Sequence, residues 1–168
     1  ALAARDKLIM RERMRDSGVL CPSFSAFPLD ADPTVIAART SYPCILKPLL
    51  LNGSRGVIRA NNTVEFETAW KRISTILQKS VGKHILVEDY IPGKEFAVEA
   101  LLSEGGLRVL ALFDKPDPLD GPFFEETIYI TPSRLNANEK DKILSATNEA
   151  ARALGLCFGP VHAEFRVN

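Results

Sequence analysis

This 168-residue sequence has few cysteines and no excess of charge of either sign. Its three cysteines, Cys21, Cys44 and Cys157, are widely spaced and lie among apolar residues. An odd number of scattered cysteines argues against a disulfide framework or a zinc site and predicts reduced thiols in a cytoplasmic protein. Because 21 basic residues balance 21 acidic ones, the net charge predicts neither a nucleic-acid partner nor an anionic membrane surface.

Long apolar runs and the common nucleotide and hydrolase motifs are also absent. No stretch resembles a membrane span or a signal peptide. The patterns G-x-x-x-x-G-K-[ST], G-x-G-x-x-G, H-E-x-x-H and G-x-S-x-G do not occur. Protein kinases carry a glycine loop before their strand lysine, whereas here the glycines follow Lys47. The length suffices for one substantial core or for two small lobes.

Neither end of the chain has the form of a natural terminus. The sequence starts without methionine and stops at Asn168, inside an alternating strand pattern. We therefore expect it to be a piece of a larger protein.

Capping residues and apolar periodicity predict the helices. Asp6 caps a helix over residues 6–17, and Asp32 with Pro33 opens a second one. Asn62 with Glu65 begins a third helix. Its stripe of Phe66, Trp70, Ile73 and Leu77 predicts packing in a core. A fourth helix is expected from Asn136 to Leu154.

The stretch Tyr42–Asn61 predicts a hairpin with a cation at the end of its first strand. A short apolar run ends in Lys47, the flexible segment Asn52-Gly53-Ser54-Arg55-Gly56 follows, and Val57 resumes an extended pattern. Backbone N–H groups in a glycine loop beside a lysine suit the oxygens of a phosphate chain. A hairpin with one solvated lysine on its rim would have the same pattern.

From residue 84 the sequence predicts long strands that carry acidic residues, namely Glu88, Glu95, Glu99 and Glu164. Carboxylates are depleted in strands and costly when buried unpaired. They predict a sheet that faces ribose hydroxyls, an adenine amino group or Mg²⁺. A sheet with one solvated face and routine Glu–Lys pairs is the alternative.

Strand alternation also groups the polar residues by face. Glu95, Ala97 and Glu99 share one face of their strand, and His162, Glu164 and Arg166 share one face of the last strand. His162 with Glu164 has a spacing that suits a divalent ion, although Mg²⁺ prefers carboxylate and phosphate oxygens to imidazole.

Together these segments resemble the ATP-grasp superfamily, within it the carboxylate–amine ligase and biotin-carboxylase-like branch. The similarity covers nearly the whole chain. It consists of D-K-x-x-M-R from Asp6, G-V-x-x-P from Gly18, Y-P-x-I-L-K-P with G-S-R-G-V in the hairpin, V-E-D-Y-I-P-G-K-E-F from Val87, F-D-K-P from Phe113 and G-P-V-H-x-E-F from Gly159. Each motif is only moderately specific, and their order and spacing carry the resemblance.

The resemblance implies an α+β fold of the ATP-grasp type, with two α+β lobes and the nucleotide between antiparallel sheets. Residues 1–19 would form a leading helix, and residues 20–84 a small lid subdomain with the glycine loop. Residues 85–168 would form a larger subdomain that is truncated at its C-terminus.

The resemblance further implies a nucleotide site. Lys7 and Lys47 would bind the phosphates of ATP, although Lys7 alone has the pattern of a solvated surface lysine. Gly53, Ser54, Arg55 and Gly56 would close over the phosphates. Glu88 would accept from the adenine amino group, the backbone of Asp89, Tyr90 and Ile91 would pair with the ring edge, and Glu95 would hold the ribose.

For the chemistry, the resemblance implies Glu164 as the first ligand of Mg²⁺, with Mn²⁺ as an alternative metal. His162 and Lys115 would act as catalytic residues beside the γ-phosphate or the acceptor, and Glu125 or Glu126 would face the substrate. The ATP γ-phosphate would be transferred to a small-molecule carboxylate, and an amine or similar nucleophile would attack the resulting acyl phosphate. The remainder of the same polypeptide would be a partner, and a homodimer stays open.

The sequence departs from the family in extent. The second acid, the asparagine and the arginine that follow the Glu164 strand in the family are absent. We therefore expect this fragment alone to be inactive. A non-catalytic nucleotide-binding or regulatory module is the alternative function. A structural α+β domain without a ligand would require coincidence at five motifs.

Overall fold

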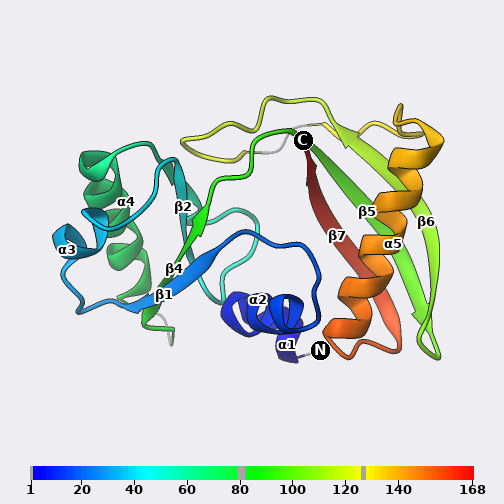
Figure 1. Ribbon diagram of the computed structural model, residues 1–168, viewed down its shortest axis with the longest axis horizontal. Helices are drawn as coiled ribbons and strands as arrows, with labels where there is room; N and C mark the ends of the chain where they lie inside the picture. Colours follow the sequence, from blue (N-terminus) through cyan, green and yellow to red (C-terminus); the bar gives the residue numbers. More distant parts are fainter. Residues whose placement is uncertain (1, 79–81, 126–127) are drawn as a thin grey trace.

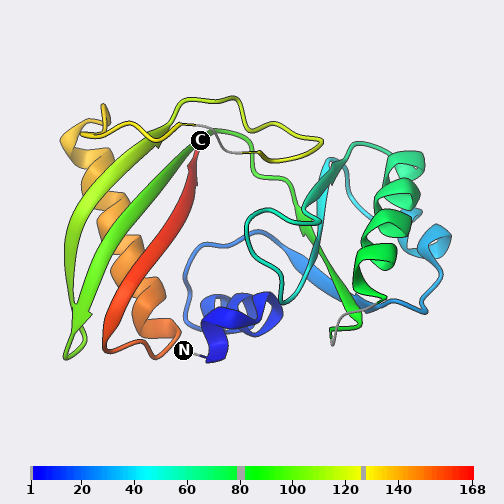
Figure 2. The same cartoon turned by 180° about the vertical axis from the view of Figure 1, so that it is seen from behind.

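A computed structural model describes residues 2–78, 82–125 and 128–168 (Figure 1). Two antiparallel sheets, the first covered on one face by two helices and the second by one, lie side by side as two lobes (Figures 1 and 2). The strand order is β1-β4-β2-β3 in the first sheet and β6-β5-β7 in the second. The predicted α+β class is therefore confirmed.

The first lobe packs two helices on one face of its sheet. Its elements are β1 (Phe24–Pro28), α3 (Pro33–Ala37), β2 (Cys44–Pro48), β3 (Ile58–Ala60), α4 (Thr63–Leu77) and β4 (His84–Asp89). Alternate strand residues, such as Leu46, Ile58 and Val87, are buried against the helices. The predicted stripe of α4 lies in the same core, and Asn62 caps that helix by accepting from the Glu65 N–H at 2.9 Å.

Two helices precede this lobe. Asp6 caps α2 (Lys7–Asp16) and accepts from the backbone N–H of Leu8 at 2.9 Å, as the sequence predicts. The short α1 (Leu2–Arg5) was not predicted, because four residues carry no periodic pattern. In Figure 2, α2 lies beside the strands of the first sheet and toward the second lobe.

The second lobe packs one helix on a three-stranded sheet. It consists of β5 (Lys94–Ser103), β6 (Gly106–Lys115), α5 (Ala137–Ala153) and β7 (Gly159–Val167). Phe96, Val98 and Ala100 form a core with Ile143 of α5, and the opposite face of the sheet carries the polar residues. Asn136 and Glu139 form the predicted capping box. Within the described ranges, no helix has the length and hydropathy needed to cross a membrane.

The change from one sheet to the other occurs between Asp89 and Lys94. β4 pairs with β1 and with β2, so it belongs to the first sheet. This change lies five residues after the sequence-based boundary at residue 84. A strand's own pattern does not reveal which sheet it joins. The division into functional subdomains stays a prediction.

A segment after β6 connects the two lobes, and we call residues 116–125 the strap. It leaves the second sheet and reaches the outer strand of the first, where Phe123 bridges to Ile58. The Arg59 N–H donates to the Pro122 carbonyl at 3.0 Å. Gly121 allows this approach, because its φ is +91° and an added Cβ would lie 2.9 Å from the Cβ of Arg59.

Candidate functional site

A cluster of charges occupies the face of the first sheet opposite α3 and α4. Ile45 pairs with Glu88 and Lys47 pairs with Leu86, so Lys47 and Glu88 project from the same face of neighbouring strands. The Lys47 ammonium forms an ion pair with Oε2 of Glu88. Arg11 of α2 binds the same carboxylate through Nε, 2.6 Å from Oε1, and Nη2, 3.3 Å from Oε2. Glu88 is only 3% exposed.

Lys7 joins this cluster from the first turn of α2. Its ammonium donates to the carbonyl oxygens of Leu51 and Leu49. Lys7 is thus attached to the start of the glycine loop rather than pointing freely into solvent. We call Lys7, Arg11, Lys47 and Glu88 the cationic cluster, because three positive groups surround one negative group.

The pKa directions in the cationic cluster follow from burial and mutual charge. Burial lowers the pKa of Lys7, and the neighbouring Lys47 lowers it further. Burial also lowers the pKa of Lys47, although Glu88 opposes the shift. For Glu88, burial raises the pKa, but Lys47 and Arg11 outweigh it and the net shift is downward. An anion that approached these cations would relieve the excess positive charge.

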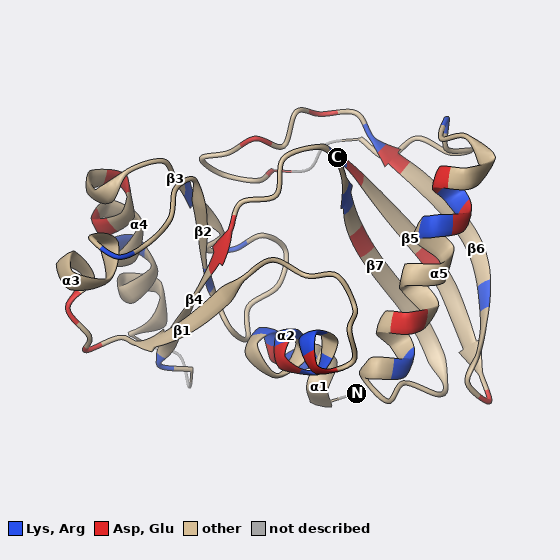
Figure 3. Ribbon diagram, viewed as in Figure 1, with Lys and Arg blue, Asp and Glu red and all other residues tan. Residues whose placement is uncertain are grey.

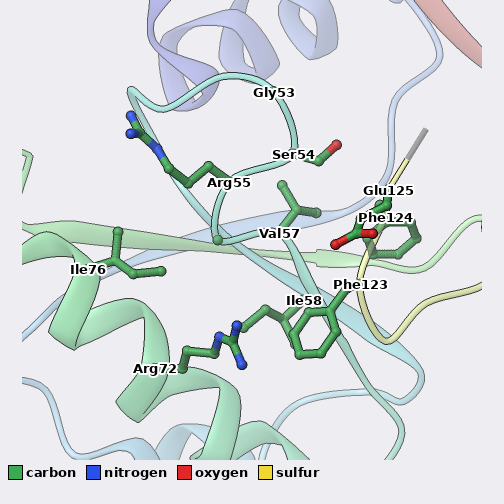
Figure 4. A pocket seen from close by; sticks show the side chains of 11 residues that line it. Gly53, Ser54, Arg55, Val57, Ile58, Arg72, Ile76, Phe123, Phe124 and Glu125 are labelled. Carbon is green, nitrogen blue, oxygen red and sulfur yellow. The ribbon is translucent and has the colours of Figure 1, made fainter. Parts of the chain in front are cut away.

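The glycine loop connects β2 to β3 next to a cavity of about 800 Å³. Gly53, Ser54, Arg55 and Gly56 all line this cavity, together with residues of α4 and the strap (Figure 4). Arg72 of α4 lies over the ring of Phe123, 4.6 Å from its centroid. Glu125 also lines the cavity, whereas Glu126 lies outside the described residues. None of the residues of the cationic cluster lines this cavity.

The segment that connects β4 to β5, residues 90–93, presents backbone groups for hydrogen bonding. The Tyr90 N–H donates to the Pro43 carbonyl at 3.1 Å. Pro43 has no N–H to return to the Tyr90 carbonyl. In the part of the chain that the structure describes, the N–H of Ile91 has no hydrogen-bond partner. The Ile91 N–H is therefore available as a donor to a planar ligand.

The remaining predicted residues converge on the polar face of the second sheet. Register places Glu95 opposite both Lys115 and Arg166, and Glu99 opposite His162. The Lys115 ammonium bridges two carboxylates, 2.5 Å from Glu95 and 2.7 Å from Glu164. Arg166 binds the other oxygen of Glu95 at 3.0 Å. We call Glu95, Glu99, Lys115, His162, Glu164 and Arg166 the acidic-face cluster.

His162 connects the two outer carboxylates of the acidic-face cluster. Its Nδ1 lies 2.7 Å from Glu99 Oε1, and its Nε2 lies 3.6 Å from Glu164 Oε1. Burial lowers the pKa of His162, but the hydrogen bond to Glu99 and the charges of both carboxylates outweigh it, so the net shift is upward. The predicted common face of His162, Glu164 and Arg166 is confirmed.

Glu164 is the residue of this cluster that suits a metal ion. Its side chain is 42% exposed, whereas Lys115 beside it is 1% exposed. Over the described ranges, no group of three or more His, Cys, Asp or Glu side chains has the arrangement of a metal site. Mg²⁺ keeps several waters and uses one or two carboxylates plus substrate phosphates. Glu164 therefore fits as one ligand of such an ion.

Three site residues were not assigned a role from the sequence: Arg11, Glu99 and Arg166. Arg11 lies four residues after Lys7, which places both on one face of α2. The positions of Arg166 and Glu99 on the polar faces of their strands follow from the strand alternation that the sequence shows. Their partners, however, lie far away in the chain, as the Arg11–Glu88 separation of 77 residues illustrates.

The two clusters, one on each sheet, lie close enough to interact electrostatically. The Glu164 carboxylate is close enough to act on the pKa of Lys47, which it raises slightly against the larger effect of burial. Figure 3 shows charged segments on α2, β2, β4 and β7, near the middle of the molecule. A cluster rich in cations and a cluster with a metal-suited carboxylate thus lie close together.

Comparison with known proteins relates this arrangement to a family. Residues 40–168 match the ATP-grasp domain. The D-alanine–D-alanine ligase of Marinomonas sp. (strain MWYL1) is 27% identical over 161 residues, which are 93% of this chain and 49% of that protein. The alanine–anticapsin ligase of Bacillus subtilis (strain 168) is 27% identical and is matched over 98% of this chain and 38% of its own length.

Solved structures agree with these matches. The crystal structure of L-amino acid ligase from Bacillus licheniformis superposes with a TM-score of 0.82 at 30% identity, over 99% of this chain and 38% of that one. The chain thus spans less than half the length of each of these three relatives. The predicted fold and resemblance are confirmed, and the chain belongs to the ATP-grasp domain family.

Proposed function

We propose that this chain is the ATP-binding portion of an ATP-dependent ligase. The complete enzyme phosphorylates a small-molecule carboxylate and joins the acyl phosphate to an amine or a similar nucleophile. The observation that carries the proposal is the proximity of the cationic cluster to the acidic-face cluster, since Glu164 acts on the pKa of Lys47. A polyphosphate with a bound divalent ion needs cations beside its phosphates and a carboxylate beside its metal.

The cationic cluster would hold the phosphates. Lys47 is the principal charge, and Lys7 lies beside it at the base of the glycine loop. Residues Gly53 to Gly56 would close over the phosphates, which shields a reactive acyl phosphate from water. Catalysis would depend mainly on positioning and on neutralising phosphate charge.

The connection between the lobes would hold the adenine. The backbone of Asp89, Tyr90 and Ile91 would pair with the ring edge, with the Ile91 N–H donating to a ring nitrogen of adenine. Glu95 would hold the ribose. The predicted adenine contact of Glu88 would have to compete with Arg11 and Lys47, which bind both of its oxygens.

The acidic-face cluster would hold the metal and the reacting groups. Glu164 would be one ligand of Mg²⁺ or Mn²⁺, which would neutralise phosphate charge when bound. Lys115 and His162 flank Glu164 and would stabilise the transferring phosphate or orient the acceptor. The named relatives are ligases of amino acids, so amino acids are the substrates to test first, in a cytoplasmic enzyme.

Nucleotide titration of the complete protein tests this proposal. Lys47→Met should raise the Kd for Mg–ATP about 10- to 100-fold, because a charge-assisted contact contributes roughly 1.5–3 kcal/mol. Lys71→Met, on the exposed side of α4, is the matched control and should bind as the unchanged protein does. Equal affinity in the two variants would contradict the assignment of the phosphate site.

Phosphate release then distinguishes a ligase from a non-catalytic module. The complete protein should release phosphate from ATP only when a carboxylate substrate and an amine are present. Tight ATP binding without turnover for any pair of amino acids would favour a regulatory nucleotide-binding module.

A further inference from the structure

Glu88 pairs with two cations, so the carboxylate keeps a positive partner when one of them leaves. Its two carboxylate oxygens accept from Nε and Nη2 of Arg11, and Oε2 also pairs with the Lys47 ammonium. Both cations reach Glu88 from different elements, Arg11 from α2 and Lys47 from β2. The carboxylate is almost fully buried. It therefore depends on these cations rather than on water.

Binding of a phosphate by Lys47 would compete with its ion pair to Glu88. A buried carboxylate that loses its only cation is strongly destabilised, because its charge is then uncompensated. Lys47 can turn toward an incoming anion without this cost only if another cation stays on Glu88. Lys7 cannot take that place while its ammonium is bound to the Leu51 and Leu49 carbonyls. Arg11 already contacts both oxygens, as the planar guanidinium fork allows.

We propose that Arg11 is a positioning residue that retains the Glu88 carboxylate while Lys47 moves from Glu88 to the phosphates of ATP. The inference rests on the proposed nucleotide site. In the absence of nucleotide, Lys47 pairs with Glu88. When the phosphates arrive, Lys47 exchanges one oxygen anion for another, and Arg11 alone satisfies Glu88.

A double-mutant cycle in the complete protein tests this exchange, with Mg–ATP affinity as the readout. In Arg11→Gln, Glu88 has only Lys47 left, so the Kd should rise about tenfold, the loss expected for one charge-assisted contact. Adding Glu88→Gln removes the carboxylate that retains Lys47. The Kd of the double variant should then be lower than that of Arg11→Gln, since such coupling is what a cycle measures.

The same cycle contains the results that would overturn the proposal. If Arg11 only stabilises the fold, the double variant binds ATP as weakly as Arg11→Gln or more weakly. Arg13→Gln, at an exposed position of the same helix, is the matched control and should leave the Kd unchanged. Arg11→Lys retains the charge without the fork and should weaken binding less than Arg11→Gln does.

Folding and nucleotide binding can be separated from the exchange. Circular dichroism and thermal unfolding identify a variant that does not fold. If Arg11→Gln is such a variant, the cycle is run with Arg11→Lys, and the absence of recovery in Arg11→Lys with Glu88→Gln then rejects the exchange. Failure of the unchanged protein to bind ATP would instead reject the proposed nucleotide site.

Discussion

Cys44 illustrates how one buried position controls reactivity. Its side chain is 1% exposed, and burial, with a smaller contribution from Asp89, raises the pKa of the thiol to about 12. The thiolate is the reactive form of cysteine. Under native conditions at neutral pH, iodoacetamide should label the exposed Cys157 and leave Cys44 unmodified. Mass spectrometry measures the labelling, and unfolding in urea should make Cys44 reactive. Rapid native labelling of Cys44 would contradict this expectation.

His162 is a second residue whose chemistry follows from its neighbours. Since its pKa in the folded chain lies above the ordinary value of 6.5, the stabilisation from its protonated form is complete below about pH 6.5. That stabilisation is lost as the pH rises through the folded-state pKa. Glu99→Gln should remove one hydrogen-bonded charge and lower the pKa of His162. An NMR titration measures the change, with the His84 signal as internal reference. An unchanged titration of His162 would contradict the role of Glu99.

Among the elements, α4 supplies much of the core of the first lobe. Phe66 is fully buried, stacks on Trp70 with ring centroids 6.0 Å apart, and meets Tyr42 edge-on at 6.4 Å. Phe66→Ala should lower the free energy of unfolding by about 3–5 kcal/mol. Val64 on the same helix is 73% exposed, so Val64→Ala should change stability by less than about 0.5 kcal/mol. Urea unfolding measures both, and similar losses in both variants would contradict this packing.

Elements with strong local signals were predictable from the sequence, and contacts between elements were not. α2, α4 and α5 begin at capping residues that act on their own backbone. Lys7 shows the limit of such reasoning. Its place in the first turn of a helix predicts a solvated side chain, but its ammonium binds Leu51, 44 residues away. The sheet that β4 joins could not be predicted for the same reason, because strand pairing is non-local.

At the scale of the whole molecule, Tyr90 links both lobes to the strap. Its hydroxyl donates to Asp120 Oδ1 at 2.8 Å and accepts from Arg166 Nη1 at 3.2 Å. Arg59 of the first sheet lies over its ring, 4.1 Å from the centroid. Tyr90→Phe removes only the hydroxyl, so the lobes should stay folded while the strap opens more often.

Hydrogen–deuterium exchange measures this effect. The strap amides in Tyr90→Phe should exchange up to about tenfold faster, because a hydrogen bond contributes roughly 0.5–1.5 kcal/mol. Tyr42→Phe removes a hydroxyl that bonds to Ala37 within the first lobe, and it should leave the exchange of the strap unchanged. Equal exchange in the two variants would show that Tyr90 does not hold the strap.

The position of the strap also bears on self-association. β3 is an outer strand of its sheet, and an outer strand can recruit a second chain through its free backbone groups and so start aggregation. The strap occupies part of this edge, with the Pro122 carbonyl on the Arg59 N–H and the bridge from Phe123 to Ile58. It therefore protects the chain against edge-to-edge polymerisation, so changes that loosen it should lower solubility at high protein concentration.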